Sequence, residues 1–156
     1  MKYPLAWFLT WTTYGTWLHG DARGSHIGSH PLPPNPELEA SMRAEMTEDV
    51  AILTDVQRAL VGEAIVRECA NQGWFLHARN VRTNHVHVVV SASAEGSIVL
   101  ARLKAVASNA LSDQAGLPMT AGRNGRRRWW TEKGNKVPVE HEAALAEFVQ
   151  YVSDLQ

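Results

Sequence analysis

The chain has 156 residues, of which 45% are hydrophobic and 20% are charged, and its formal net charge is −1. This composition is typical of one globular domain with a sizeable core, and no apolar run reaches the roughly 18 residues that a membrane span needs. The balanced charge excludes a polycation, so any affinity for nucleic acid must come from a local basic patch.

The N-terminal half predicts one strand, a long insertion and one helix. Residues 5–17, rich in Trp, Phe and Thr, predict the strand and contain no recognisable secretion signal, so a cytoplasmic location is expected. No regular element is expected in the insertion at about 18–50, which has four prolines within 31–36. Apolar residues at helical spacing predict a helix over 54–72, with Thr54 as N-cap and Gly73 as its end.

The C-terminal half completes an alternating pattern of strands and helices. Strands are expected at 74–81 and 84–91, joined by a tight turn at 82–83, and a helix at 96–116 with Ser97 as its cap and Gly116 as its stop. Residues 126–139 predict a strand, a Gly-Asn turn and a return strand, and 140–156 predict a last helix. The β-α-β-β-α-β order predicts a single α+β domain over 1–156, with a ferredoxin-like antiparallel sheet and packed helices.

Two histidines, His85 and His87, interrupt the valines of the strand at 84–91. Residues two apart on a strand share one face, and their Cα atoms are about 6.6 Å apart. Two imidazoles at this spacing can bind one divalent cation together with a third ligand, and histidine ligands alone would favour zinc or another transition metal. The alternative is that both histidines are tolerated on a solvated sheet face. The only cysteine, Cys69, excludes a cysteine-based zinc cluster and an internal disulfide.

A basic segment, residues 122–136, contains a Trp-Trp pair and six Arg or Lys side chains against one Glu. Positive charge beside aromatic rings suits phosphates and stacked bases, whereas the alternative is a solvated loop whose tryptophans belong to the core. Basic side chains elsewhere can extend the patch, and Asn84 can orient the loop before the histidines. The DNA-binding candidates are Arg82, Asn84, Lys104, Arg123, Arg126, Arg127, Arg128, Trp130 and Lys133.

The sequence "NHVHVVV" at 84–90 resembles the His-hydrophobic-His motif of the HUH endonuclease superfamily. Segments 10–24, 73–92 and 128–135 and the terminal "YVSDLQ" resemble single-tyrosine transposases near the REP-associated tyrosine transposases, so the resemblance spans nearly the whole chain. It implies a ferredoxin-like core, hairpin-forming single-stranded DNA as partner, and Mg²⁺ or Mn²⁺ at the histidines, with Zn²⁺ in preparations exposed to it. It implies no nucleotide cofactor, and both monomers and homodimers occur among similar proteins. No membrane partner is expected, because the sequence has no long apolar run.

The resemblance also implies a tyrosine nucleophile on the last helix, where Tyr151 stands; Tyr3 and Tyr14 are the other tyrosines. The tyrosine attacks a DNA phosphate, keeps the 5′ end and releases a 3′-OH. On a helical wheel Tyr151 falls at the edge of the buried stripe, so the alternative is that its ring completes the core.

Similar transposases often take a third metal ligand from a Gln or Asn one helical turn after the tyrosine. Here Leu155 occupies that position and Gln156 follows it, so Gln156 is the candidate third ligand. Glu147, one turn before Tyr151, lies closer to the helix face that carries Tyr151, but the resemblance does not support it as a ligand. A second hypothesis for the whole chain is a catalytically inactive or domesticated nucleic-acid-binding module on the same fold.

Overall fold

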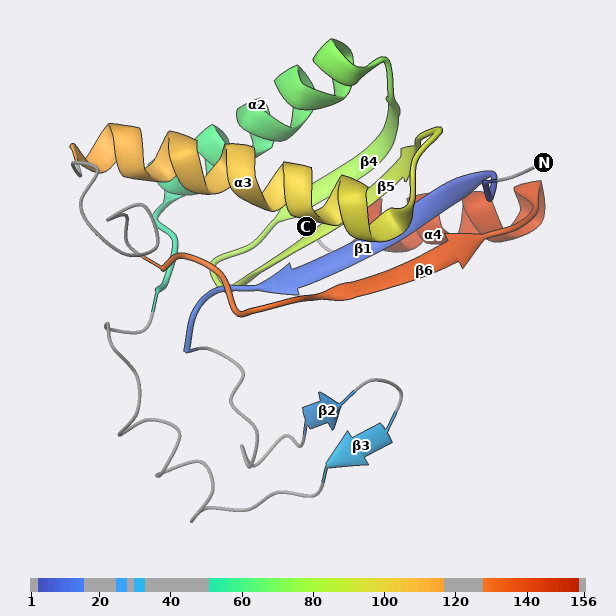
Figure 1. Cartoon of the computed structure of the whole chain (residues 1–156), viewed down its shortest axis with the longest axis horizontal. Helices are drawn as coiled ribbons and strands as arrows, with labels where there is room; N and C mark the ends of the chain where they lie inside the picture. Colours follow the sequence, from blue (N-terminus) through green and yellow to red (C-terminus); the bar gives the residue numbers. More distant parts are fainter. Residues whose placement is uncertain (1–2, 16–24, 28–29, 33–50, 117–127, 155–156) are drawn as a thin grey trace.

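A central antiparallel sheet organises the structure, a computed structural model that describes residues 3–15, 25–27, 30–32, 51–116 and 128–154 (Figure 1). Its strand order is β4-β5-β1-β6. The strands are β1 (Ala6–Thr12), β4 (Phe75–Val81), β5 (His85–Ser91) and β6 (Asn135–Val139), and the helices are α2 (Asp55–Gln72), α3 (Gly96–Ala115) and α4 (Glu142–Asp154). Of the four strands of this sheet, the first and third in chain order, β1 and β5, lie at the centre, which confirms the predicted ferredoxin-like α+β fold.

Helices α2 and α3 cover one face of the sheet, and α4 covers part of the other face (Figure 1). Strand β5 shows how the sequence separates the two layers. Val86, Val88 and Val90 are buried against α2 and α3, whereas Val89 belongs to a smaller core with Val152 of α4. Because side chains alternate along a strand, His85 and His87 must share the face that carries α4.

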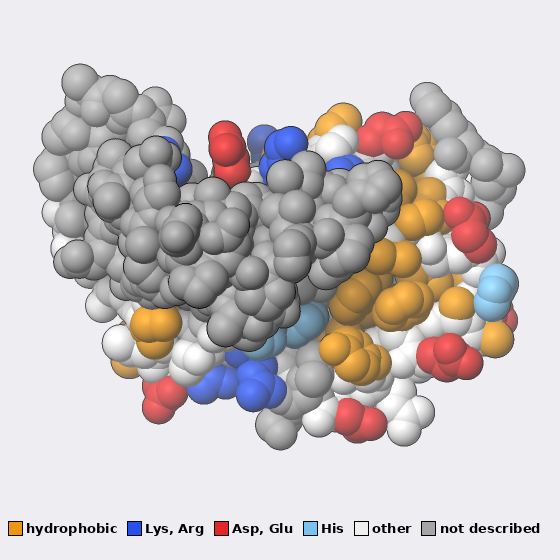
Figure 2. Space-filling view, turned by 90° about the horizontal axis from the view of Figure 1, so that it is seen from below, with side chains coloured by type: hydrophobic (Ala, Val, Ile, Leu, Met, Phe, Trp, Pro, Cys, Tyr) orange, Lys and Arg blue, Asp and Glu red, His pale blue; other side chains and the backbone are white. Residues whose placement is uncertain are grey.

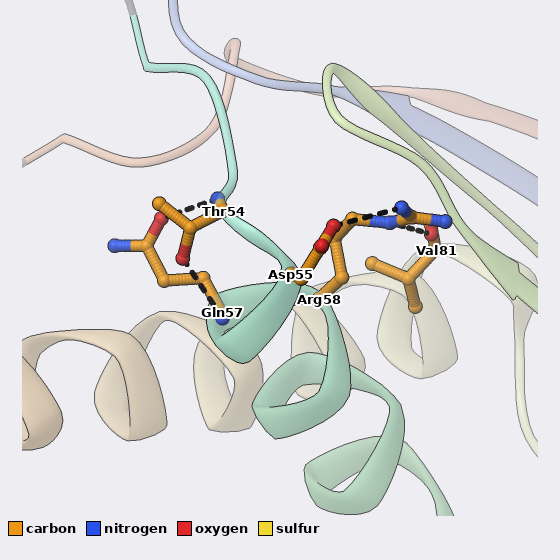
Figure 3. A network of polar contacts seen from close by, with 5 residues as sticks. All are labelled: Thr54, Asp55, Gln57, Arg58 and Val81. Atoms are coloured by element: carbon orange, nitrogen blue, oxygen red, sulfur yellow. Dashed lines mark hydrogen bonds and ion pairs between the residues drawn. The ribbon is translucent and has the colours of Figure 1, made fainter.

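Helix α2 begins and ends as its sequence predicts. The Thr54 hydroxyl accepts a hydrogen bond from the Gln57 backbone N–H at 3.2 Å, and the Gln57 side chain accepts one from the Thr54 N–H at 2.9 Å, a complete capping box (Figure 3). Arg58 in the same turn donates to the carbonyl of Val81, which ties the start of the helix to the end of β4. Gly73 ends the helix in a left-handed conformation, φ 73°.

The predicted insertion at about 18–50 does contain regular structure, contrary to expectation. Strands β2 (Ser25–Ile27) and β3 (His30–Leu32) pair with each other in a separate two-stranded sheet. Three residues are too few for an alternation of apolar and polar positions to be detected in the sequence, so the pattern gives no signal for these strands. The other residues of the insertion up to position 50 lie outside the described ranges.

Two further sequence predictions were wrong in detail. Residues 128–134 form no strand that pairs with β6; Trp130 makes a single bridge to Thr13, and β6 pairs with β1 instead. Both Trp129 and Trp130 are buried, and two successive inward side chains do not fit a strand. Helix α3 begins at Gly96 after Glu95, so Ser97 is not its cap; Gly96 packs against the ring of Trp7, a contact that α3's own sequence does not encode.

No helix within the described ranges is both long and apolar enough to cross a membrane.

Candidate active site

The two histidines converge at the start of β5. His85 is half-buried and His87 is 7% exposed, and their ring centroids are 4.8 Å apart with the rings nearly perpendicular. Across the sheet His85 pairs with Thr12 of β1, and His87 lies between Thr10 of β1 and Asn80 of β4. The β-strand spacing alone therefore brings two imidazoles into one small volume, as predicted.

Hydrogen bonds orient both rings through the same ring atom. Nδ1 of His87 lies 3.3 Å from the Thr10 hydroxyl, and Nδ1 of His85 lies 2.5 Å from the side-chain oxygen of Asn84. Polar partners of this kind fix the orientation of metal-binding histidines in known metal sites. Asn84 thus has the orienting position that the sequence suggested, whereas Thr10 was not anticipated.

His87 is neutral at physiological pH. Burial, and to a lesser degree positive charge on His85 and Arg82, lowers the pKa of His87 from 6.5 to about 4. Neutral imidazole is the form that binds a cation, because a protonated ring has no lone pair to donate. The electrostatics of the site therefore favour coordination by His87 over protonation.

Tyr151 of α4 lies beside the histidines on the same face of the sheet. Its ring centroid is 6.1 Å from that of His87, edge to face, and 6.1 Å from that of Phe8 on β1. Tyr151 is 52% exposed, so its ring does not complete the core; that place is taken by Val152, with Phe148 stacked on Phe8 at 4.8 Å. The side chain that the resemblance marks as the nucleophile is therefore accessible from the solvent.

Tyr14 occupies a different environment. Its side chain is 8% exposed within the core formed under α2 and α3, and the guanidinium of Arg128 lies 5.1 Å from its ring centroid. Tyr151, by contrast, is in ring contact with His87.

The sequence analysis named two residues that could supply a third metal ligand. Gln156 lies outside the described residues, and Glu147 is exposed on α4. Within the ranges that the structure describes, no three His, Cys, Asp or Glu side chains gather closely enough to hold a metal ion. The donor set consists of two oriented imidazoles, one of them clearly neutral, and this set fits a divalent cation that takes its other ligands from elsewhere.

Two of the DNA-binding candidates have structural roles. The Lys104 ammonium donates to the carbonyls of Thr131 and Lys133, at 2.9 and 2.5 Å, and burial lowers the pKa of Lys104 to about 8. Trp130 is 7% exposed, packs edge-on against Trp11 and donates its indole N–H to the Lys104 carbonyl. In this arrangement Trp130 has no open ring face on which a base could stack.

Other candidates lie closer to the site. Arg82 is one of them, because its charge contributes to the lowered pKa of His87. The segment that contains Lys133 is held near the site by a hydrogen bond: the Thr12 hydroxyl, opposite His85 on the sheet, donates to the Thr131 hydroxyl at 2.9 Å. This bond places residues 131–134, with the exposed Lys133, near the histidine end of the sheet. Arg123, Arg126 and Arg127 lie outside the described residues. Figure 2 shows histidine side chains at the surface between basic side chains and an apolar area.

Sequence reasoning missed Asn80, which is buried on β4 next to His87 and donates a hydrogen bond to the Val152 carbonyl of α4 at 3.1 Å. A buried Asn within a strand is unusual, since Asn is depleted in strands, and this was the one available signal. Its partner could not be found from the sequence, because the two residues are 72 positions apart.

Comparison with known proteins bears on this arrangement only through structure, since no family model and no curated protein matches the sequence. One similar structure is a REP-associated tyrosine transposase bound to a REP hairpin; the alignment has a TM-score of 0.54 and 13% identity, and covers 94% of this chain and 63% of that one. The chain shares its fold with transposases. A second similar structure is a candidate transposase from Deinococcus radiodurans R1. Its alignment has a TM-score of 0.54 and 15% identity, and covers 99% of this chain and 92% of that one.

These comparisons confirm the predicted resemblance at the level of the fold. The chain spans less than two thirds of the hairpin-bound transposase but nearly all of the Deinococcus protein. At such low identity, an assignment of activity has to come from the geometry of the site.

Proposed function

We propose that this protein cleaves and rejoins single-stranded DNA, with Tyr151 as the nucleophile and His85 and His87 as ligands of Mg²⁺ or Mn²⁺. The observation that carries the proposal is the exposed Tyr151 ring in edge contact with His87, on one face of a sheet whose fold is similar to that of transposases. Zn²⁺ can replace the working metal in preparations exposed to it, because two imidazoles also suit zinc.

In the proposed reaction the phenolic oxygen of Tyr151 attacks a DNA phosphate. The new Oη–P bond forms as the P–O3′ bond breaks; the phenolic proton is released, and the leaving 3′ oxygen takes up a proton. The DNA 5′ phosphate stays on the tyrosine. Rejoining reverses these steps with a 3′-OH as nucleophile, and because the phosphotyrosine conserves the phosphodiester energy, no nucleotide cofactor is needed.

A phenol is a weak nucleophile at neutral pH, so placement and charge stabilisation have to supply the rate. A divalent cation on the two imidazoles would polarise the scissile phosphate and offset its developing charge. The chain itself contributes the orientation of both histidines through Thr10 and Asn84, and the fixed position of the tyrosine helix on the same sheet face.

We propose hairpin-forming single-stranded DNA as the substrate, since one structural neighbour is a transposase bound to a REP hairpin. Phosphates near the scissile bond would meet Arg82, whose charge acts on His87, and then the basic segment 122–136. Lys133 and the arginines of this segment are its candidate phosphate contacts.

The second candidate function is DNA binding without catalysis on the same fold. It is favoured by one observation: among the described residues the histidine pair has no third His, Cys, Asp or Glu ligand beside it. A two-ligand site would bind a catalytic metal weakly, and such a protein would hold DNA without cutting it.

Covalent trapping distinguishes the two functions. The protein is incubated with Mn²⁺ and a library of hairpin-bearing single strands, and mass spectrometry of the adduct should place the nucleotide on Tyr151. Tyr151→Phe keeps the ring and its contacts with His87 and Phe8, so it should bind DNA as before and form no adduct. Tyr14→Phe is the matched control and should react normally.

An adduct on Tyr14, or full cleavage by Tyr151→Phe, would overturn the assignment of the nucleophile. DNA binding without any adduct, at every metal tested, would favour the inactive binding module.

A further inference from the structure

Asn80 joins the tyrosine helix to the strand beside the histidines. Its side chain is 6% exposed, and Nδ2 donates to the Val152 carbonyl at 3.1 Å. On the sheet Asn80 is the direct neighbour of His87, and along α4 Val152 directly follows Tyr151. One hydrogen bond therefore connects the residue next to the proposed ligand with the residue next to the proposed nucleophile.

The Val152 carbonyl, which accepts the hydrogen bond from Asn80, lies in the last turn of α4 that the structure describes, Glu142–Asp154. In the parts of the chain that the structure describes, this is the only hydrogen bond recorded between α4 and the sheet. The other contacts are apolar, between residues such as Val149 and Val152 and the core around Val89.

Apolar contacts hold a helix against a sheet without specifying its rotation or its axial position closely, because burial is non-directional. A shift of one residue along α4 turns a side chain by about 100° and moves it by about 1.5 Å. A displacement of about 1 Å at a reacting group can cost roughly 100-fold in rate. The bond from Asn80 is the directional contact that opposes such a shift in the last turn.

We infer that Asn80 is a positioning residue, which fixes the last turn of α4 and so sets Tyr151 against His85 and His87. This inference rests on the proposed function, although it also makes a structural statement that can be tested alone. The side chain of Asn80 donates its hydrogen bond to the Val152 carbonyl, so Asn80 acts on Tyr151 through the helix.

The kinetic test compares two variants that loosen α4 in different ways. Asn80→Ala removes the hydrogen bond, and Val149→Ala removes apolar packing from the same helix and leaves the bond in place. At saturating DNA and Mn²⁺, Asn80→Ala should slow adduct formation at least tenfold, with DNA and Mn²⁺ affinities within twofold of the parent. Val149→Ala should slow it less than threefold. Equal slowing in both variants at equal loss of stability would show a merely structural role and overturn the inference.

Nuclear Overhauser effects between the Tyr151 and His87 rings provide a readout that does not need activity. The parent and Val149→Ala should show them in the metal-free protein, and Asn80→Ala should lose most of their intensity. If Asn80→Ala does not fold, Asn80→Leu removes the donor while nearly preserving side-chain volume. Unchanged ring contacts in the folded variant would refute the inference. Absence of any adduct in the parent would refute only the proposed function.

Discussion

The buried His87 should make the stability of the metal-free protein depend on pH. The pKa of His87 is lowered to about 4 in the folded protein, mainly by burial, whereas an unfolded chain titrates near 6.5. Between these values the unfolded state binds more protons than the folded state. Stability is therefore complete above about pH 6.5 and is lost as the pH falls towards 4.

The size of the effect follows from the same interval. Each pH unit between the folded pKa of about 4 and the unfolded pKa of 6.5 changes the free energy of unfolding by about 1.4 kcal/mol. The whole interval therefore corresponds to a loss of at most about 3 kcal/mol. With His87 only 7% exposed, solvent screening reduces this figure little. A domain of this size typically has 5–15 kcal/mol of total stability, roughly, so the loss should be easy to measure.

The assay is urea unfolding at several pH values from 7.5 to about 4.5, with a chelator present because a bound cation would compete with the proton. His77 and Glu68 also have lowered pKa values, and His87→Gln keeps their contributions while removing that of His87. The parent should lose more of its free energy of unfolding than His87→Gln does, by about 2 kcal/mol over this range. Parallel pH profiles would mean that His87 is not buried in its neutral form, and the electrostatic description of the site would fail.

Three other changes test the metal site, the DNA surface and the fold. His85→Ala should abolish calorimetric binding of Mn²⁺ and cleavage, whereas His141→Ala, at an exposed position, should retain both; a fully active His85→Ala would show the site to be misassigned. Replacing the three arginines at 126–128 by Ala should flatten the salt dependence of binding to single-stranded DNA, by up to about 2 in the log–log slope. An unchanged slope would place the DNA elsewhere. Thr54→Ala should lower the free energy of unfolding by about 1 kcal/mol through loss of the capping box, and Thr54→Ser should not.

Much of the fold could be predicted because local signals and tertiary structure agree. Thr54, Gly73 and Gly116 mark the ends of helices through hydrogen bonds to residues only a few positions away. These helix ends could therefore be predicted from the local sequence. The alternation of histidine and valine from 85 to 88 likewise indicates which side chains share a face of the strand. The histidine pair was predictable for this reason.

Predictions failed where the deciding contact lies far away in the chain. The start of α3 depends on Trp7, and the path of residues 128–134 depends on the Lys104 ammonium and on two buried tryptophans. Nothing in the local pattern distinguishes a Trp that stacks on a base from one that fills a core, since both are large aromatic side chains beside basic residues.

By itself, the sequence determined the order of the main strands and helices and the shared face of His85 and His87. Tyr151 became the candidate nucleophile only through the resemblance to tyrosine transposases. Only the tertiary structure decided that Tyr151 stands beside His87 with half its surface exposed, while Tyr14 lies in the opposite layer. The physical reason is that strand register and helix docking join residues remote in sequence. Asn80 and Val152, 72 positions apart, form one such contact, and no local periodicity encodes it.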